Sequence, residues 1–374
     1  MPAATAPEPE NATALCLSGG GYRAMLFHLG TLWRLNELGV MKTLRRVSSV
    51  SGGSITAATL GLHWKRLTWS ADGIATNFAQ VVATPLHALA SHTLDVTSVL
   101  SGALLPFVTV SDRVQSAYST DLFGTATLQD LPDDTDRAAP RFIVNATNVQ
   151  TGALWRFSRP YAGDYRVGRI RHPTTSLAMA VGASSAFPPF LSPCLLSLQG
   201  ASWMEGEGEA AYASFRDRVV LTDGGVYDNL GLETAYKRCR ALLVSDAGQA
   251  LGPERAPHED WARHAVRVLA LIDHQVRSLR KRMLLNALTT GARTGAYFSI
   301  RTPLEHYGLP TALAVDAARA MELAAVETRL ASLGETVQQR IVNWGYAACD
   351  TSVRRWYLRD AAAPTAMPYP GSGV

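Results

Sequence analysis

Two short apolar segments that each end in a glycine-rich turn and lead into a helix-compatible stretch constrain this chain most. The first turn is Gly19-Gly20-Gly21, and a helical stretch over residues 22–38 follows it. The second turn surrounds Ser51, and a helical stretch over 53–67 follows it. A repeated strand–turn–helix order requires right-handed crossovers and a parallel sheet covered by helices. We therefore expect an α/β fold, a three-layer sandwich around a central, mostly parallel sheet.

Composition limits the classes of protein that this chain can belong to. Its 374 residues are 47% hydrophobic and 18% charged, which is enough for a sizeable core in one large domain or two smaller ones. The net charge is +4 without an arginine- or lysine-rich block, so we expect no nucleic-acid partner. The four cysteines are widely spaced and form no metal-ligand pattern with histidine. We expect neither a metal nor a cofactor.

The N-terminal residues and the hydropathy pattern predict where the protein resides. The first eleven residues lack the basic start and the apolar run of a signal peptide. No uncharged apolar stretch reaches the roughly 18 residues that a membrane-spanning helix needs. The sequence therefore predicts a soluble, cytoplasmic protein that is at most peripheral at a membrane.

The pattern along the chain predicts a flexible tail, one α/β catalytic domain and a helical extension packed on that same domain. The tail covers residues 1–11, the α/β domain 12–260 and the extension 261–374. Within the domain, residues 73–130 read as a mostly helical, cap-like insertion that could cover the active edge of the sheet. Further expected elements are strands at 13–17, 44–50, 141–146, 153–158, 219–222 and 241–245, and helices at 177–186, 261–290, 315–333 and 335–349.

Ser51 stands at the tip of the second turn, where a strand passes directly into a helix. A serine hydroxyl is a poor nucleophile unless a base removes its proton and the backbone holds it for attack. A sharp strand-to-helix turn presents the hydroxyl above the sheet edge and needs small residues two positions to either side. Those positions are Ser49 and Gly53, so serine replaces the first glycine of the usual pattern. An ordinary Ser-Gly turn is the alternative.

The first turn, Gly19-Gly20-Gly21, has the composition of an anion-binding loop. Glycine permits positive φ and lets backbone N–H groups turn toward a ligand, where they can stabilise an oxyanion. Arg23 would add a fixed positive charge nearby. A nucleotide-binding loop is disfavoured, because the glycines fit neither the spacing of dinucleotide-binding proteins nor that of P-loop proteins. A plain structural turn is the remaining alternative.

Asp223 ends an apolar strand and is followed by Gly224 and Gly225. Since the carboxyl ends of parallel strands face the active crevice, this aspartate could reach Ser51. It could act as the base directly or orient a histidine. An Asx-turn is the alternative for an isolated Asp-Gly pair. A serine–histidine–aspartate triad would require one of the histidines that follow Asp223, namely His258, His264, His274 or His306.

Taken together, these three elements resemble the patatin-like phospholipase family. The family pattern is a Gly-Gly-Gly-x-Arg/Lys loop, a Gly-x-Ser-x-Gly turn and an Asp-Gly-Gly/Ala motif. Here the corresponding segments begin at Gly19, Ser49 and Asp223, and residues 183–188 and 226–231 are also similar to the family. The resemblance covers roughly residues 12–250.

The resemblance implies hydrolysis of lipid acyl esters, with a phospholipid or another acyl ester as substrate. It implies that Ser51 attacks the ester carbonyl and that Asp223 accepts its proton, in a Ser–Asp dyad without histidine. It also implies that the N–H groups of residues 19–21 hold the oxyanion. A catalytically inactive lipid-binding or regulatory protein with the same fold is the alternative.

The helix expected from Trp261 onward has two distinct faces. Arg263, Arg267, His274, Arg277 and Lys281 recur at near-helical spacing, and an apolar stripe occupies another side. The stripe comprises Val268, Ile272, Val276, Leu279 and Met283. Such a helix could lie on an anionic bilayer. Alternatively, it packs on the domain and exposes a basic face to solvent.

Overall fold

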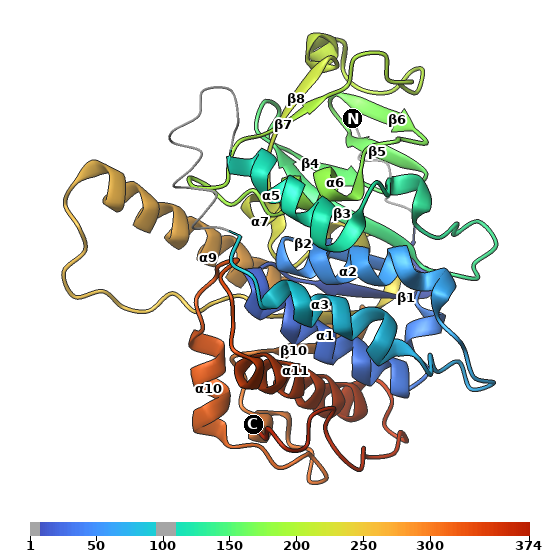
Figure 1. Ribbon diagram of the computed structural model, residues 1–374, viewed down its shortest axis with the longest axis vertical. Coiled ribbons are helices and arrows are strands. Elements are labelled where there is room, and N and C mark those ends of the chain that lie inside the picture. The colour runs from blue at the N-terminus through green and yellow to red at the C-terminus, as the bar shows by residue number, and fades with distance from the viewer. Residues whose placement is uncertain (1–7, 95–109) are drawn as a thin grey trace.

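A central sheet organises the protein, as the computed structural model in Figure 1 shows for residues 8–94 and 110–374. Ten strands of these described residues join in the order β10-β9-β1-β2-β3-β4-β5-β6, with β8 paired to β3 and β7 paired to β8. The first five are parallel to their neighbours, and β4 to β8 pair antiparallel. The bounds are β1 Glu10–Leu17, β2 Arg46–Val50, β3 Arg141–Asn148, β4 Ala153–Phe157, β5 Tyr161–Asp164, β6 Gly168–Arg171, β7 Cys194–Ser197, β8 Arg218–Asp223, β9 Cys239–Asp246 and β10 Thr294–Ser299.

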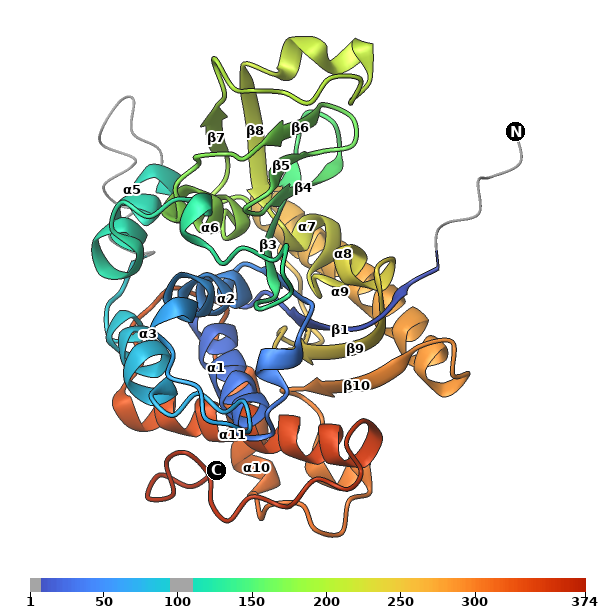
Figure 2. The ribbon, with the colours of Figure 1, turned by 90° about the vertical axis from the view of Figure 1, so that its right-hand side faces the viewer.

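Helices cover both faces of this sheet, which gives the three layers that Figure 2 shows from the side. Helices α1, α2, α6 and α11 pack on one face, and α7, α8 and α9 on the other. Helices α3 and α5 lie outside α1 and α6. The bounds are α1 Gly21–Glu37, α2 Gly52–His63, α3 Thr84–Ala90, α5 Val110–Tyr118, α6 Leu177–Ser184, α7 Gly225–Asp228, α8 Leu232–Tyr236, α9 Trp261–Thr289, α10 Ala317–Ala325 and α11 Glu335–Trp356.

The closest helix pair joins the two ends of the chain. Helix α11 packs along α1, and two glycines bring their backbones into contact. A methyl group at Gly30 would clash with the carbonyl oxygen of Val342, and one at Gly345 would clash with that of Phe27. The C-terminal helix therefore shares the main core with the first strand–turn–helix unit.

The predicted α/β fold with a mostly parallel sheet is confirmed, and the predicted strands and long helices are present. Three differences matter. The strand expected at residue 13 already begins at Glu10, so the last two residues of the predicted tail belong to the sheet. The C-terminal extension is not purely helical, because β10 adds an edge strand parallel to β9. Finally, helix α10 covers only part of the stretch expected at 315–333.

The insertion predicted at 73–130 is helical where the structure describes it. Two π-helical segments, Ala79–Ala83 and Ser119–Phe123, adjoin α3 and α5. Residues 95–109 of this insertion, and residues 1–7 of the predicted tail, lie outside the described part of the chain.

The close α1–α11 packing yields a stability prediction. Alanine normally stabilises a helix interior by about 1 kcal/mol relative to glycine. At Gly345 we expect the opposite, because the added methyl group would force the two backbones apart and destabilise the protein by about 2 kcal/mol or more. Thermal unfolding of Gly345→Ala measures this effect. Gly252→Ala is the control, since nothing lies within 4 Å of its methyl position. Equal midpoints for the two variants would contradict the packing described.

Candidate active site

Two strands meet head to head along one edge of β3, and their meeting point defines the site. Strand β2 pairs with β3 up to Val50 opposite Asn145. Strand β8 approaches from the other direction and pairs antiparallel, with Asp223 opposite Ala146. Ser51 directly follows β2 and Asp223 is the last residue of β8, and these two strands point at each other. The expectation that Asp223 ends a parallel strand is wrong, although the two residues do come together.

Ser51 occupies a strained turn. Its φ of 51° and ψ of −121° lie where side-chain-bearing residues are rare, and only 9% of the residue is exposed. Two close approaches hold the turn in place. A methyl group at Gly52 would clash with the carbonyl group of Gly21, and one at Gly53 would clash with that of Leu17. The glycines after Ser51 therefore let the first loop pack directly on the N-terminus of α2.

Ser49, which replaces the first glycine of the usual pattern, is buried and fits without disrupting the turn. Its hydroxyl donates to the Ile143 carbonyl at 3.2 Å and accepts from the Ser54 hydroxyl at 3.0 Å. Ser54 Oγ lies 3.0 Å from Ser184 Oγ, which in turn accepts from the Ser51 N–H at 2.9 Å. The extra hydroxyl thus joins a hydrogen-bonded group of serines that ends at the backbone of Ser51.

Asp223 is buried within reach of the Ser51 side chain. Burial raises the pKa of Asp223 to about 7, and hydrogen bonds from the Gly225 N–H and the Ser51 side chain oppose that rise. The Gly225 N–H lies 2.6 Å from Asp223 Oδ1. Asp273 on α9 adds a repulsive contribution that raises the pKa of Asp223 further. The carboxyl group can therefore gain and lose a proton near neutral pH.

Gly224 and Gly225 allow the chain to turn tightly after Asp223. A methyl group at Gly224 would clash with the carbonyl oxygen of Asn145. One at Gly225 would lie 2.9 Å from Asp223 Oδ1. Both glycines are therefore required by close contacts at the end of β8.

The glycine loop lies directly beside Ser51, and its three N–H groups are not equivalent. A methyl group at Gly19 would lie 3.2 Å from Ser51 Cβ. The Gly19 N–H already donates to the backbone oxygen and to Oδ1 of Asn229, each at 3.1 Å. The N–H groups of Gly20 and Gly21 have no hydrogen-bond acceptor among residues 8–94 and 110–374. Two of the three predicted donors thus remain available for a ligand.

The Arg23 side chain lies beside Gly20 of the glycine loop, because a methyl group at Gly20 would lie 2.9 Å from Arg23 Nη2. It is fully buried and donates to the carbonyl oxygens of Ala247 and Val326 and to the hydroxyl of Thr328 at 2.9 Å. Burial lowers the pKa of Arg23 to about 10. Arg23 therefore ties two loops to the start of α1.

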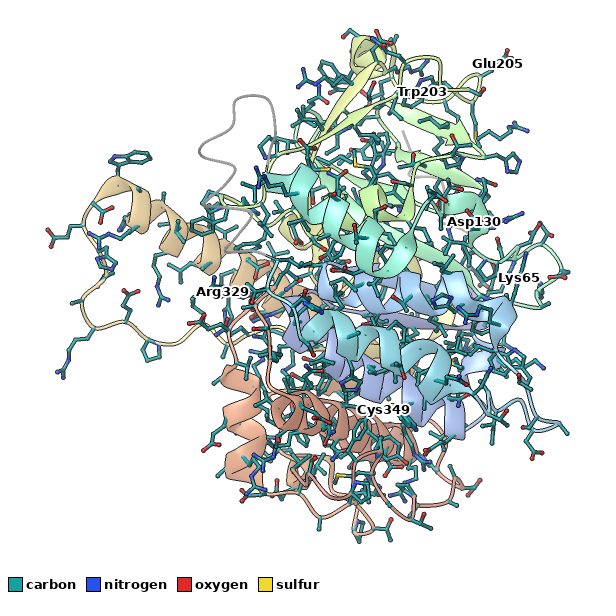
Figure 3. All side chains as sticks on the ribbon, viewed as in Figure 1. Lys65, Asp130, Trp203, Glu205, Arg329 and Cys349 are labelled. Carbon is teal, nitrogen blue, oxygen red and sulfur yellow. The ribbon has the colours of Figure 1, made fainter. Side chains whose placement is uncertain are left out.

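The segment that follows α10 passes over the glycine loop. The Tyr22 N–H donates to the carbonyl oxygen of Arg329 at 3.0 Å, and Figure 3 labels Arg329 near the base of α9. A cavity of about 220 Å³ lies here, lined by Tyr22, Arg23, Val326, Glu327, Arg329, Ala331 and Leu333. A larger cavity of about 560 Å³ lies under β4 to β6 and has neither Ser51 nor Asp223 in its lining.

The four histidines considered for a triad do not join this site. In the described residues none of them forms a hydrogen bond with Ser51 or Asp223. His258, His264 and His306 are exposed, and His264 contacts the carbonyl oxygen of His258. Partial burial lowers the pKa of His274. The described contacts therefore bring none of these four histidines to Ser51 or Asp223.

Comparison with known proteins identifies the family of this chain. A family model described as patatin-like phospholipase matches residues 15–236, more than half of the chain. The chain belongs to the patatin-like phospholipase family.

The chain is also similar to solved structures of other proteins. Human GIVD cytosolic phospholipase A2 is 15% identical with a TM-score of 0.41, over 63% of this chain and 43% of that one. VipD from Legionella pneumophila is 18% identical with a TM-score of 0.35, over 91% of this chain and 66% of that one. The chain therefore spans less than half of the first protein and about two thirds of the second. A search of curated proteins returned no match.

Three residues that support the site were not singled out from the sequence. Asn145 is the last residue of β3 that pairs with β2 before β8 takes over the pairing. Its amide group donates to the Ser49 carbonyl at 2.9 Å. Ser184 donates to the carbonyl oxygen of Asn145 at 2.6 Å. Asn229 accepts from Gly19. Ser184 and Asn229 lie in the two additional segments, 183–188 and 226–231, that resemble the family, so the resemblance could have identified them.

Among the residues described, there is neither a candidate metal site nor a helix that could span a membrane. No group of three or more histidine, cysteine, aspartate or glutamate side chains could hold a metal ion. No described helix has both the length and the apolar character that crossing a bilayer requires.

The buried carboxyl group makes a pH-dependent stability prediction. Because the pKa of Asp223 is raised on folding, the native state binds its proton more tightly than the unfolded state does. Stability is therefore lost as pH rises from about 4 through about 7. Asp223→Asn removes this loss, since asparagine does not ionise. At pH 8 we expect this variant to have a higher thermal midpoint than the wild type and an unfolding free energy that is larger by up to roughly 4 kcal/mol. Both differences should shrink toward pH 4. A difference that is independent of pH would contradict this assignment.

Proposed function

We propose that the protein is a serine lipid acyl hydrolase in which Ser51 and Asp223 form a catalytic dyad. The observation that carries the proposal is the meeting of Ser51, just after β2, with the buried Asp223 at the end of β8, a carboxyl group whose pKa burial raises to about 7. A carboxylate with that pKa can accept the serine proton at neutral pH and return it later in the cycle.

In the first half of the reaction, Ser51 Oγ attacks the carbonyl carbon of the acyl ester while its proton moves to Asp223. The tetrahedral intermediate collapses, the ester bond breaks and the proton passes to the alcohol that leaves. An acyl-Ser51 ester remains. In the second half, Asp223 takes a proton from water, the resulting nucleophile attacks the acyl group, and Ser51 regains its proton as the fatty acid leaves.

The negative charge that forms on the carbonyl oxygen requires hydrogen-bond donors. We assign the N–H groups of Gly20 and Gly21 to this role, because the glycine loop packs against Ser51 and Gly52 and these two groups have no acceptor among the described residues. Gly19 and Arg23 instead hold the loop, through Asn229 and through the carbonyl groups of Ala247 and Val326. This assignment narrows the oxyanion donors expected from the sequence.

The substrates we propose are phospholipids or other acyl esters, in keeping with the family. The strained Ser51 supports turnover over lipid binding alone, because a backbone in this region costs about 1–3 kcal/mol and serves to present a nucleophile.

A fluorophosphonate probe tests the nucleophile. We expect it to label Ser51 of the wild-type protein and to leave Ser51→Ala unlabelled. Mass spectrometry of mixed phospholipids should show fatty-acid release by the wild type that falls at least about 10³-fold in Ser51→Ala and Asp223→Asn. Alanine at His258, His264, His274 or His306 should leave the rate within a few-fold. A folded wild-type protein that binds lipid but releases no fatty acid would show the inactive alternative instead.

The pH dependence of hydrolysis tests the base. Since Asp223 must be ionised to accept the proton, kcat/KM should rise about tenfold per pH unit below about 7 and level off above it. The profile should be measured on a soluble, short-chain ester, so that lipid packing does not change with pH. A rate that is flat between about pH 5 and 8 would count against Asp223 as the base.

A further inference from the structure

Helix α9 exposes apolar side chains along its whole length. Figure 1 shows the first half of this helix extending away from the body of the protein, beside the loop that leads into it. Of the fifteen large hydrophobic residues that are exposed in the described part of the chain, nine lie on α9. Single exposed hydrophobic residues are common, but a concentration of this kind on one element marks an interaction surface.

Six of these side chains share one side of the helix. All of them except Leu269 follow a spacing of seven, four, seven and four residues, which returns to the same direction on an α-helix. Trp261 is 85% exposed at the outer end, and Ile272 and Leu279 are 55% and 57% exposed further along. The α9 stripe comprises Trp261, Val268, Leu269, Ile272, Leu279 and Met283, and it extends for about 33 Å. Most of the stripe predicted from the sequence is thus exposed and not packed on the domain.

The charges around the stripe favour an anionic partner. Residues 251–289 contain seven arginines and lysines against four acidic residues. Arg263 and Arg267 form exposed ion pairs with Asp260 and Glu254, which contribute little to stability. Arg282 is exposed and has no ion-pair partner among the described residues.

An adjacent side of α9 borders the proposed active site. Arg280 forms an ion pair with Asp228 at 3.4 Å and donates to the carbonyl oxygen of Tyr227, which fixes α9 to α7. Asp273 is close enough to raise the pKa of Asp223. The stripe therefore belongs to a helix that is held against the catalytic residues.

Further exposed hydrophobic residues lie near Asp223 in the sequence or next to a residue that forms a backbone hydrogen bond with it. Val226 follows it by three residues and is the second residue of α7. Phe187 follows Ala186, whose carbonyl oxygen accepts from the Asp223 N–H at 3.0 Å, and Phe190 lies in the same turn. Exposed apolar surface thus occurs both at the site and on the helix beside it.

We propose that α9 docks on the surface of an anionic phospholipid bilayer and thereby delivers membrane lipids to Ser51. The proposal rests on the proposed lipid hydrolase function, for which it names the physical state of the substrate. A tryptophan at the outer end of an apolar stripe suits the interface between head groups and acyl chains. A second copy of the chain fits less well, because residues 251–289 carry a net charge of +3 (seven basic minus four acidic residues) in each copy, and these charges would repel each other. The helix lies along the membrane, since its charged side prevents it from crossing.

Vesicle sedimentation with Ser51→Ala as background tests docking without hydrolysis, so it does not depend on the proposed chemistry. We expect this protein to bind vesicles of phosphatidylcholine and phosphatidylserine and to bind pure phosphatidylcholine more weakly. Adding Trp261→Ser, Ile272→Ser and Leu279→Ser should lower the partition coefficient by about tenfold per side chain. Trp356→Ser is the matched control, because Trp356 is also exposed but ends α11. It should not change binding.

Activity measurements on proteins that retain Ser51 complete the test. The triple variant should hydrolyse a soluble short-chain ester at the wild-type rate and vesicle phospholipid at least tenfold more slowly. Equal vesicle binding by the triple variant and its parent would overturn the proposal. The proposal would also be overturned if the protein bound no vesicles and sedimentation velocity showed a wild-type dimer that the three serine substitutions dissociate. Failure of both proteins to hydrolyse any ester, with stripe-dependent vesicle binding intact, would refute the catalytic proposal and leave the docking surface standing.

Discussion

One edge of strand β3 is shared by two strands that arrive from opposite directions, and the site depends on that division. Strand β2 occupies the edge up to Asn145, and β8 occupies it from Ala146 onward. Neither strand can extend further without displacing the other, so the residues at their ends must meet. Asn145 stabilises the junction, because its side chain binds Ser48, Ser49 and Thr234 and its carbonyl oxygen accepts from Ser184.

The junction concentrates features that oppose stability. Ser51 has an unfavourable φ, and Asp223 is a buried carboxyl group with a raised pKa. Close backbone packing at Gly52 and Gly53 and the serine hydrogen bonds around Ser184 compensate for these costs locally. Strained and desolvated groups of this kind are typical of catalytic sites, where they are retained because the chemistry needs them.

The part of the chain beyond the family match completes the frame of the site. The match ends at residue 236. Val326, Thr328 and Arg329 nevertheless accept hydrogen bonds from Arg23 and Tyr22, directly after the glycine loop. Helix α11 closes the core against α1, and α9 places Asp273 near Asp223. The C-terminal third therefore contributes to the same structural unit as the residues that we propose to be catalytic. Its exposed helix α9 is the surface that we propose to contact lipid.

The sequence by itself determined the α/β class, the two strand–turn–helix units and the identity of Ser51 and Asp223 as candidates. Those features are local, since glycine at a turn and the apolar period of a strand are written in neighbouring residues. Only the tertiary structure decided that β8 runs antiparallel, that Arg23 is a buried tie, that β10 joins the sheet and that the α9 stripe stays exposed. Each of these depends on which distant segment lies alongside, and a short strand or an amphipathic helix has the same local pattern whether its apolar side is covered by the protein or left open.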